Sequence, residues 1–135
     1  MSLEIRDTER EGIAIVALKG RLTVNEAGAV REKVAQLLAA GRKNFVFDLG
    51  GVDYIDSTGL GALVICFTTI KKAEGAMKLE NLNKRNIELL VLTKLHTIFE
   101  VFSSEEDAVN SFFPNREIKR FDILSFVKQQ EALEE

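Results

Sequence analysis

Asp56-Ser57-Thr58-Gly59-Leu60-Gly61 is the stretch of this sequence that says most about its fold. It follows an apolar run, Phe45-Val46-Phe47-Asp48-Leu49, and a short approach, Val52-Asp53-Tyr54-Ile55. Downstream of it, apolar residues recur at helical spacing: Leu60, Leu63, Val64, Phe67 and Ile70. The pattern predicts a strand, a loop and a helix, and it places the hydroxyl of Ser57 in the first turn of that helix.

The first turn of a helix is a favourable place for a negative charge. Its backbone N–H groups lack partners within the helix, and the helix dipole is positive at this end. A phosphate on Ser57 would lie among those groups, so charge could be added there without disrupting the fold. The alternative interpretation is that Asp56, Ser57 or Thr58 only caps the helix, which stabilises it by about 1 kcal/mol.

Two glycines in the same turn favour a functional role over simple capping. Gly59 and Gly61 each cost up to about 1 kcal/mol relative to alanine inside a helix. Bare backbone at this turn therefore has a use. Close approach of a partner surface, or of an enzyme that needs access to the hydroxyl, is a physical reason for it.

The N-terminal part of the chain is expected to form a hairpin. Apolar and polar residues alternate weakly over Leu3–Glu9, as in an edge strand. Ile13–Leu18 is a nearly continuous apolar run, as in a sheet that is covered on both faces. Glu11-Gly12 is expected to form the turn between them, and Gly20 to end the second strand.

Helices and strands then alternate along the chain. The first expected helix has the apolar stripe Ala27, Val30, Val34, Leu37 and Leu38, is capped by Thr23 or Asn25 and ends at Gly41. A second helix is expected from Ser57 to about Glu74, where Gly75 stops it, and a strand follows over Met77–Leu82. The remaining elements are a short helix capped by Asn83, a strand over Thr97–Phe102 and a helix capped by Ser103 or Ser104. This order predicts an α/β fold with about four helices and a mixed, mostly parallel sheet.

The 135 residues are enough for one domain with a core, followed by a separate segment after the only proline, Pro114. If that segment is helical, it carries a broad apolar stripe of Ile118, Phe121, Ile123, Leu124, Phe126 and Val127. Such a stripe is too apolar for a solvated tail. We therefore expect a domain over residues 1–113 and a C-terminal helical extension over residues 114–135, which either docks on the domain or forms a homodimer.

Composition excludes several classes of function. The net charge is −3 and no basic block is present, so direct nucleic-acid binding is not expected. No apolar run approaches about 18 residues and the N-terminus lacks the apolar region of a signal peptide, so neither a membrane span nor export is expected. The single cysteine, Cys66, cannot form an intrachain disulfide and fits a core position in a reducing compartment. The cytoplasm is the expected location.

Catalytic motifs are absent from the sequence. There is no phosphate-binding loop, and Ser57 lies outside G-x-S-x-G because Ile55 occupies the place of the first glycine. Gly59-Leu60-Gly61 is followed by Val64 where a dinucleotide fingerprint needs its last glycine. The only histidine, His96, has no evident relation to Ser57. The sequence therefore offers no base for a hydrolase.

Metal ligands are equally scarce. One histidine and one cysteine cannot form a His/Cys site. Asp48, Asp53 and Asp56 could gather near strand ends and bind Mg²⁺, but turn and cap roles suit them better. Neither a metal nor a cofactor is expected.

Taken together, Tyr54-Ile55-Asp56-Ser57-Thr58-Gly59-Leu60-Gly61 with Phe47-Asp48-Leu49 before it and Met77-Lys78-Leu79-Glu80-Asn81-Leu82 after it resembles the STAS-domain anti-sigma factor antagonists of bacteria. Gly20, Arg31-Glu32-Lys33-Val34 and Thr93-Lys94-Leu95 fit as well, so the resemblance covers roughly residues 3 to 113. It implies a STAS-like fold and a role in regulating sigma-factor-dependent transcription.

The resemblance implies a partner switch. In this family the unphosphorylated antagonist binds an anti-sigma factor, a serine kinase of the histidine-kinase ATPase type, and so frees the sigma factor. The kinase phosphorylates the serine that follows the motif aspartate, the complex dissociates, and a PP2C-type phosphatase restores the antagonist. Transferred to this sequence, Ser57 is the phosphorylation site, and the partner surface comprises Asp56, Ser57, Thr58, Gly59, Gly61 and Thr23. The ATP belongs to the partner, so the chain itself would not be an enzyme.

One turn departs from the family pattern. Many antagonists carry acidic residues in a Gly-Glu-Leu-Asp-like turn, where this chain has Gly20-Arg21-Leu22-Thr23, so partner contacts there are expected to differ. The segment after Pro114 also has no counterpart in the basic domain. Other functions stay open: a STAS subunit of a lipid-transport ATPase, a scaffold of a stress-signalling complex and, least favoured, a nucleotide hydrolase.

Overall fold

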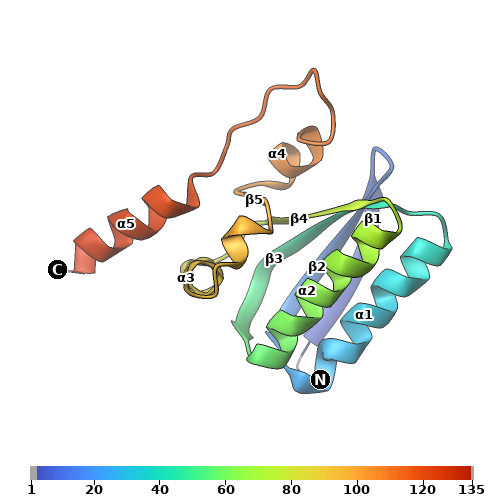
Figure 1. The fold of residues 1–135 in the computed structure, drawn as a ribbon, viewed down its shortest axis with the longest axis horizontal. Coiled ribbons are helices and arrows are strands. Elements are labelled where there is room, and N and C mark those ends of the chain that lie inside the picture. Colours follow the sequence, from blue (N-terminus) through green and yellow to red (C-terminus); the bar gives the residue numbers. More distant parts are fainter. Residues whose placement is uncertain (1–2, 135) are drawn as a thin grey trace.

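A single five-stranded sheet organises the chain in the computed structural model, which describes residues 3–134 (Figure 1). Its strands are β1 (Leu3–Arg10), β2 (Ile13–Leu22), β3 (Asn44–Ile55), β4 (Ala76–Glu80) and β5 (Val101–Phe102). They lie side by side in chain order, with β1 antiparallel to β2 and every later pair parallel. The predicted α/β fold, with a mixed, mostly parallel sheet and an N-terminal hairpin, is confirmed.

The two faces of the sheet are covered by different helices. Helices α1 (Val24–Ala39) and α2 (Ser57–Lys72) pack on one face (Figure 1), where the main core contains residues such as Val16, Val30, Phe45, Phe47, Leu63 and Leu79. The short helix α4 (Glu105–Asn110) lies on the opposite face over a second cluster of Ile13, Ile15, Val46, Phe102, Ala108 and Val109. Cover on both faces explains the nearly continuous apolar run in β2.

Both central strands are longer than predicted. Gly20 was expected to end β2, and that prediction was wrong. Gly20 has φ +117°, the register with β3 shifts between Gly20 and Arg21, and the strand continues to Leu22. A bulge of this kind bends a strand without ending it. Because the tail of β2 then pairs with the end of β3, Arg21 lies opposite Tyr54, beside the start of α2.

The strand predicted over Thr97–Phe102 is mostly wrong. A 3₁₀ turn, η1 (Leu95–Thr97), takes the start of this range, and only Val101 and Phe102 form β5. Phe99 packs into the main core, whereas Phe102 packs into the second cluster on the other face of the sheet. The apolar residues here therefore serve two different cores rather than one face of a strand.

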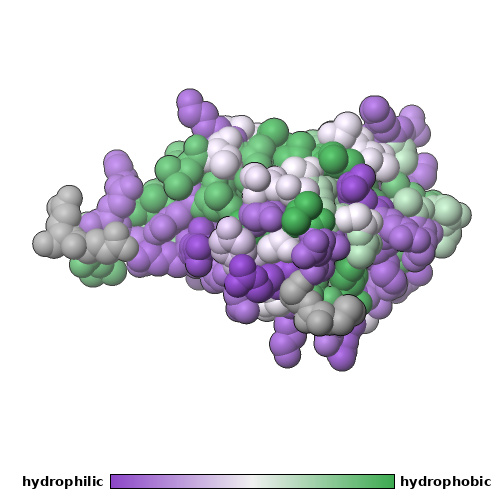
Figure 2. All heavy atoms as spheres, turned by 90° about the horizontal axis from the view of Figure 1, so that it is seen from below, coloured by the Kyte–Doolittle hydropathy of each residue, from purple (hydrophilic) through white to green (hydrophobic). Residues whose placement is uncertain are grey.

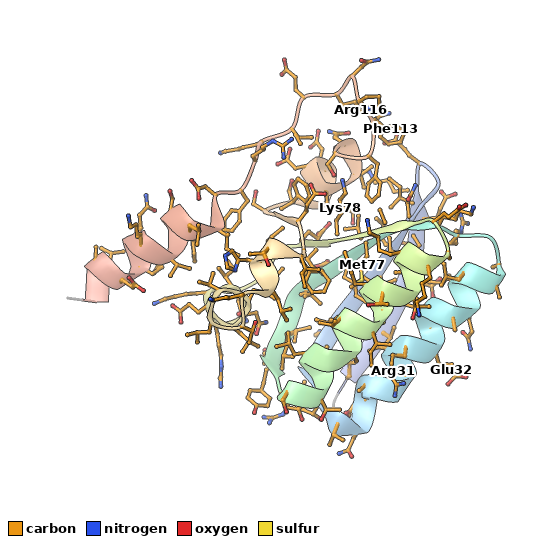
Figure 3. All side chains as sticks on the ribbon, in the orientation of Figure 1. Arg31, Glu32, Met77, Lys78, Phe113 and Arg116 are labelled. Atoms are coloured by element: carbon orange, nitrogen blue, oxygen red, sulfur yellow. The ribbon has the colours of Figure 1, made fainter. Side chains whose placement is uncertain are left out.

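The C-terminal extension docks on the domain through its first half. Arg116 forms an ion pair with Glu11 and stacks on Phe113, with 4.0 Å between its guanidinium carbon and the ring centroid (Figure 3). Ile118 then packs on the second cluster, and Phe121 lines hollows beside β5.

The helical part of the extension is shorter than predicted. Helix α5 (Ile123–Glu134) begins only after Asp122, whose carboxylate accepts hydrogen bonds from Ser125, so residues 114–122 are not helical. The helix packs against α3 (Lys84–Leu92) and projects from the body of the domain (Figures 1 and 2). Within residues 3–134, no helix combines the length and apolar character that a bilayer crossing requires.

Candidate functional site

The N-terminus of α2 is fixed by one carboxylate. Asp56 is the N-cap residue, and its Oδ1 accepts a hydrogen bond from the Gly59 N–H at 2.7 Å. Its Oδ2 accepts a second bond from the Val24 N–H at 3.1 Å, at the first residue of α1. The Asp56 N–H in turn donates to the Leu22 carbonyl at the end of β2, at 3.2 Å. Asp56 therefore joins the starts of both helices to the sheet, and its charge suits the positive ends of both dipoles.

This arrangement leaves Ser57 unused by the fold. The Ser57 and Thr58 side chains are exposed, and within residues 3–134 neither hydroxyl makes a hydrogen bond. Of the three capping candidates, Asp56 takes the role. The hydroxyl of Ser57 stands free in the first turn of α2, where the leading N–H groups lack partners within the helix. The geometry suits a residue that receives a phosphate.

The two glycines of the turn have different structural reasons. Gly59 is buried, and a Cβ there would lie 2.2 Å from the carbonyl oxygen of Leu22, so close packing of α2 on β2 already requires a glycine. A Cβ on Gly61 would meet nothing within 4 Å, so internal packing gives no reason for that glycine. The approach of a partner surface therefore remains a reason chiefly for Gly61.

Thr23 lies at the same surface, at the start of α1. It occupies the N-cap position as predicted, but its hydroxyl donates to the Glu26 carboxylate at 3.2 Å and caps no backbone group. The N–H of the next residue, Val24, is bound by Asp56. The structure thus brings Thr23 beside Asp56 and Ser57, although 32 positions separate Val24 from Asp56 in the chain.

Three neighbours of this site were not assigned to it from the sequence. Tyr54, near the end of β3, is flanked by two guanidinium groups. The guanidinium carbon lies 4.7 Å from the centroid of the Tyr54 ring in Arg21 and 5.0 Å from it in Arg85. Arg21 is one of the two residues of its turn, with Thr23, that depart from the acidic pattern of the family, and this departure was a partial signal. Arg85 comes from α3, and no local pattern connects it with Tyr54.

The remaining candidates have structural roles. Asp48 accepts a hydrogen bond from the Gly50 N–H at 2.9 Å, but both residues lie inside β3, so the expected turn role is wrong for Asp48. No group of three or more His, Cys, Asp or Glu in residues 3–134 could hold a metal ion. Cys66 is buried in the main core, as predicted, and burial raises the pKa of its thiol to about 11. His96 lies in the η1 turn.

Comparisons with known proteins match most of the chain to one family. The model of the STAS domain family matches residues 4–108. The anti-sigma-B factor antagonist of Bacillus subtilis (strain 168) is 35% identical over 109 residues, which cover 81% of this chain and 99% of that protein. The match to the family ends before Pro114, so the C-terminal extension lies outside it.

Solved structures show the same fold. An anti-sigma factor antagonist from Mycobacterium paratuberculosis has a TM-score of 0.73 at 21% identity, over 82% of this chain and 93% of that one. The Bacillus cell fate determinant SpoIIAA in its phosphorylated form has a TM-score of 0.65 at 15% identity, over 81% of this chain and 99% of that one. The family match and the Bacillus subtilis relative establish that this chain belongs to the STAS domain family.

Proposed function

We propose that this protein is an anti-sigma factor antagonist whose binding is switched by phosphorylation of Ser57. Its similarity to proteins named anti-sigma factor antagonists supports the binding role. The single observation that carries the switch is at α2: Asp56 supplies the cap, and the Ser57 hydroxyl is exposed without a hydrogen bond in the described residues. A related fold, SpoIIAA, has been solved in a phosphorylated form, which agrees with a modification of this kind.

In this proposal the unphosphorylated protein binds an anti-sigma factor that is itself a serine kinase. The bound kinase releases its sigma factor, and transcription that depends on that sigma factor proceeds. The partner supplies the ATP, so this chain is a substrate and not a catalyst, and it acts in the cytoplasm, where the sigma factor is. A PP2C-type phosphatase resets the switch.

The charge of the phosphate explains why the two forms would differ in binding and not in fold. Phosphorylation adds about −1.5 to −2 charges and three acceptor oxygens. The positive end of α2 accommodates that charge. An interface built around a neutral hydroxyl does not, and a loss of about 3 to 4 kcal/mol would weaken binding several hundred-fold.

The other site residues have supporting roles in the proposal. Asp56 holds the turn so that the Ser57 hydroxyl faces outward. Thr58, also exposed, is the less favoured acceptor because it does not directly follow the aspartate. Gly61 leaves room for the partner, and Thr23 lies at the edge of the same surface.

The test is a reconstitution with candidate anti-sigma factor kinases from the protein's own organism. Each kinase is incubated with ATP and the wild-type protein, Ser57→Ala or Thr58→Ala, and the product is examined by intact mass and phosphosite mapping. We expect one phosphate on Ser57, retained in Thr58→Ala and absent in Ser57→Ala, and much weaker kinase binding by the phosphorylated form. A kinase that binds tightly without modifying the protein would favour a scaffold or transporter-subunit role instead.

A further inference from the structure

A cluster of Arg21, Tyr54 and Arg85 lies next to the phosphorylation site proposed above. Both guanidinium groups lie over the Tyr54 ring, 4.7 Å and 5.0 Å from its centroid. Tyr54 is separated from Ser57 only by Ile55 and Asp56, and Arg21 lies opposite Tyr54 across β2 and β3. The cluster therefore lies at the end of the sheet where β3 leads into the first turn of α2 and Ser57.

Among the residues that the structure describes, the two arginines have no acidic partner. Some other arginines pair with carboxylates, as Arg10 does with Glu105 and Arg116 with Glu11, whereas Arg31 and Arg120 form no ion pair in the described residues. In the described range, residues 3–134, neither Arg21 nor Arg85 forms an ion pair, and both are exposed. Stacking on an aromatic ring fixes a guanidinium in place while its N–H groups stay available for a carboxylate.

A partly apolar groove adjoins the cluster. It has a volume of about 330 Å³ and is lined by Tyr54, Arg85, Leu89 and Leu92, among others. Leu92 is 82% exposed, the highest value among the large apolar side chains that the structure describes. The carboxylate in the groove, Glu88, lies 3.9 Å from the Lys84 ammonium and forms no ion pair with Arg21 or Arg85 in the described residues. Fixed positive charges beside an open, partly apolar groove are typical of a protein-binding surface.

We propose that this surface binds an acidic segment of the partner protein that also carries an apolar anchor residue. Carboxylates of the segment bind Arg21 and Arg85, and the anchor enters the groove beside Leu89 and Leu92. The inference rests on the proposed function, because the same partner is engaged at Ser57. Beyond that function, it specifies that the partner's contact residues at this surface carry negative charge. A net charge of −3 and the absence of a basic stripe argue against nucleic acid as the occupant.

The experiment measures binding of the candidate anti-sigma factor kinase by isothermal titration calorimetry without ATP, so that Ser57 stays unmodified. The variants are Arg21→Glu, Arg85→Glu and the double variant. We expect the double variant to bind about 30-fold more weakly and to lose most of the salt dependence of binding. Arg21→Lys with Arg85→Lys should fall between, because a lysine keeps the charge but not the stacked, bidentate geometry.

Matched controls separate this surface from a general effect of charge. Lys72→Glu with Lys43→Glu makes the same change in net charge at exposed positions that form no ion pair in the described residues, and Lys43 directly precedes β3, at the opposite end of that strand from Tyr54. Lys72 ends α2, about 22 Å along the helix from Ser57. The control should bind within about twofold of wild type, since rim charges away from an interface contribute little. Circular dichroism melts establish that every variant is folded.

The outcomes distinguish this proposal from the function on which it rests. Restored binding of Arg21→Glu by a partner in which a carboxylate is replaced by lysine would establish the contact. Unchanged affinity of the double variant, with normal phosphorylation of Ser57, would overturn the surface and leave the switch standing. A single-stranded oligonucleotide that binds wild type but not the double variant would overturn it in favour of nucleic acid. If no candidate kinase binds wild type, both proposals fail.

Discussion

At the scale of single residues, Asp56 determines the geometry of the candidate site. Asp56→Ala removes the acceptor of two backbone N–H groups, those of Gly59 and Val24. We expect the free energy of unfolding to fall by about 1 to 2 kcal/mol, the usual effect of losing a cap. Urea denaturation measures this, with Asp53→Ala as the control, because Asp53 is exposed and should change stability by less than about 0.5 kcal/mol. Equal stability of both variants would show that the two bonds contribute nothing.

Replacement by alanine should have opposite effects on stability at the two glycines of the turn. Gly59→Ala places a Cβ 2.2 Å from a backbone carbonyl that cannot easily move, so we expect a loss of about 2 kcal/mol or more. Gly61→Ala meets open space and should stabilise the helix by about 0.5 to 1 kcal/mol. The same Gly61→Ala variant should bind the kinase more weakly if a partner approaches the bare backbone. If the Gly61→Ala protein is more stable but binds the kinase with wild-type affinity, the approach of a partner does not explain why this position is a glycine.

The buried carboxyl group of Glu80 should make the stability of the protein depend on pH. Its side chain is only 3% exposed on β4, and its Oε2 accepts no hydrogen bond in the described residues. Burial, then Asp48 and Glu105, raise the pKa of its carboxyl to about 8, against the opposite effect of Arg10. The folded protein therefore keeps a proton that the unfolded chain releases, so stability should fall as pH rises from about 5 to about 8 and then level off.

The measurement for Glu80 is chemical denaturation across that pH range. Glu80→Gln, which cannot ionise, should flatten the slope and make the protein more stable than wild type at pH above about 8. Glu32→Gln, at an exposed position of α1, serves as the control and should keep the wild-type slope. A wild-type slope in Glu80→Gln would assign the pH dependence to other groups.

At the scale of elements, local patterns predicted what local forces determine. Asn83 and Ser104 cap the helices as expected, accepting hydrogen bonds from Asn86 and Asp107. Gly41 ends α1 with φ +96° and donates its N–H to the Leu38 carbonyl. These signals lie within a few residues of each other, so a sequence displays them directly.

Elements that depend on distant contacts were predicted less well. The continuation of β2 beyond Gly20 depends on its pairing with the end of β3, and the shortness of β5 depends on Phe99 and Phe102 serving different cores. The candidate site divides in the same way. Asp56 and Ser57 were predicted from one hexapeptide, whereas the position of Arg85 over Tyr54 requires α3 to be placed first.

At the scale of the whole molecule, the C-terminal extension should stabilise the domain. A chain cut at Asn115 loses the ion pair between Arg116 and Glu11, together with the apolar contacts of Ile118 and Phe121. Burial of such side chains contributes about 1.5 to 3 kcal/mol each at most, so the melting temperature should fall by several degrees. A chain that ends at Gln129 keeps these contacts and should melt close to wild type.

The same truncation tests a homodimer. Leu124 and Leu133 on α5 are 54% and 79% exposed. Because exposed apolar side chains favour association, pairing of α5 with a second copy of the chain stays a prediction. Light scattering after size exclusion measures the mass of the full and the cut chain. A mass that halves on truncation would support the dimer. If neither mass nor melting temperature changes, the extension neither docks in solution nor pairs.

The order of the strands also bears on aggregation. In the described residues β1 and β5 are the outermost strands, and an unpaired edge invites strand addition by another molecule. Along β1, charged residues such as Glu4, Arg6 and Glu9 discourage such pairing. The outer strand on the other side, β5, is two residues long, and Phe121 of the extension lies beside it. Removal of the extension therefore uncovers too little backbone to template a fibril, and the cut protein should lose thermal stability well before it loses solubility.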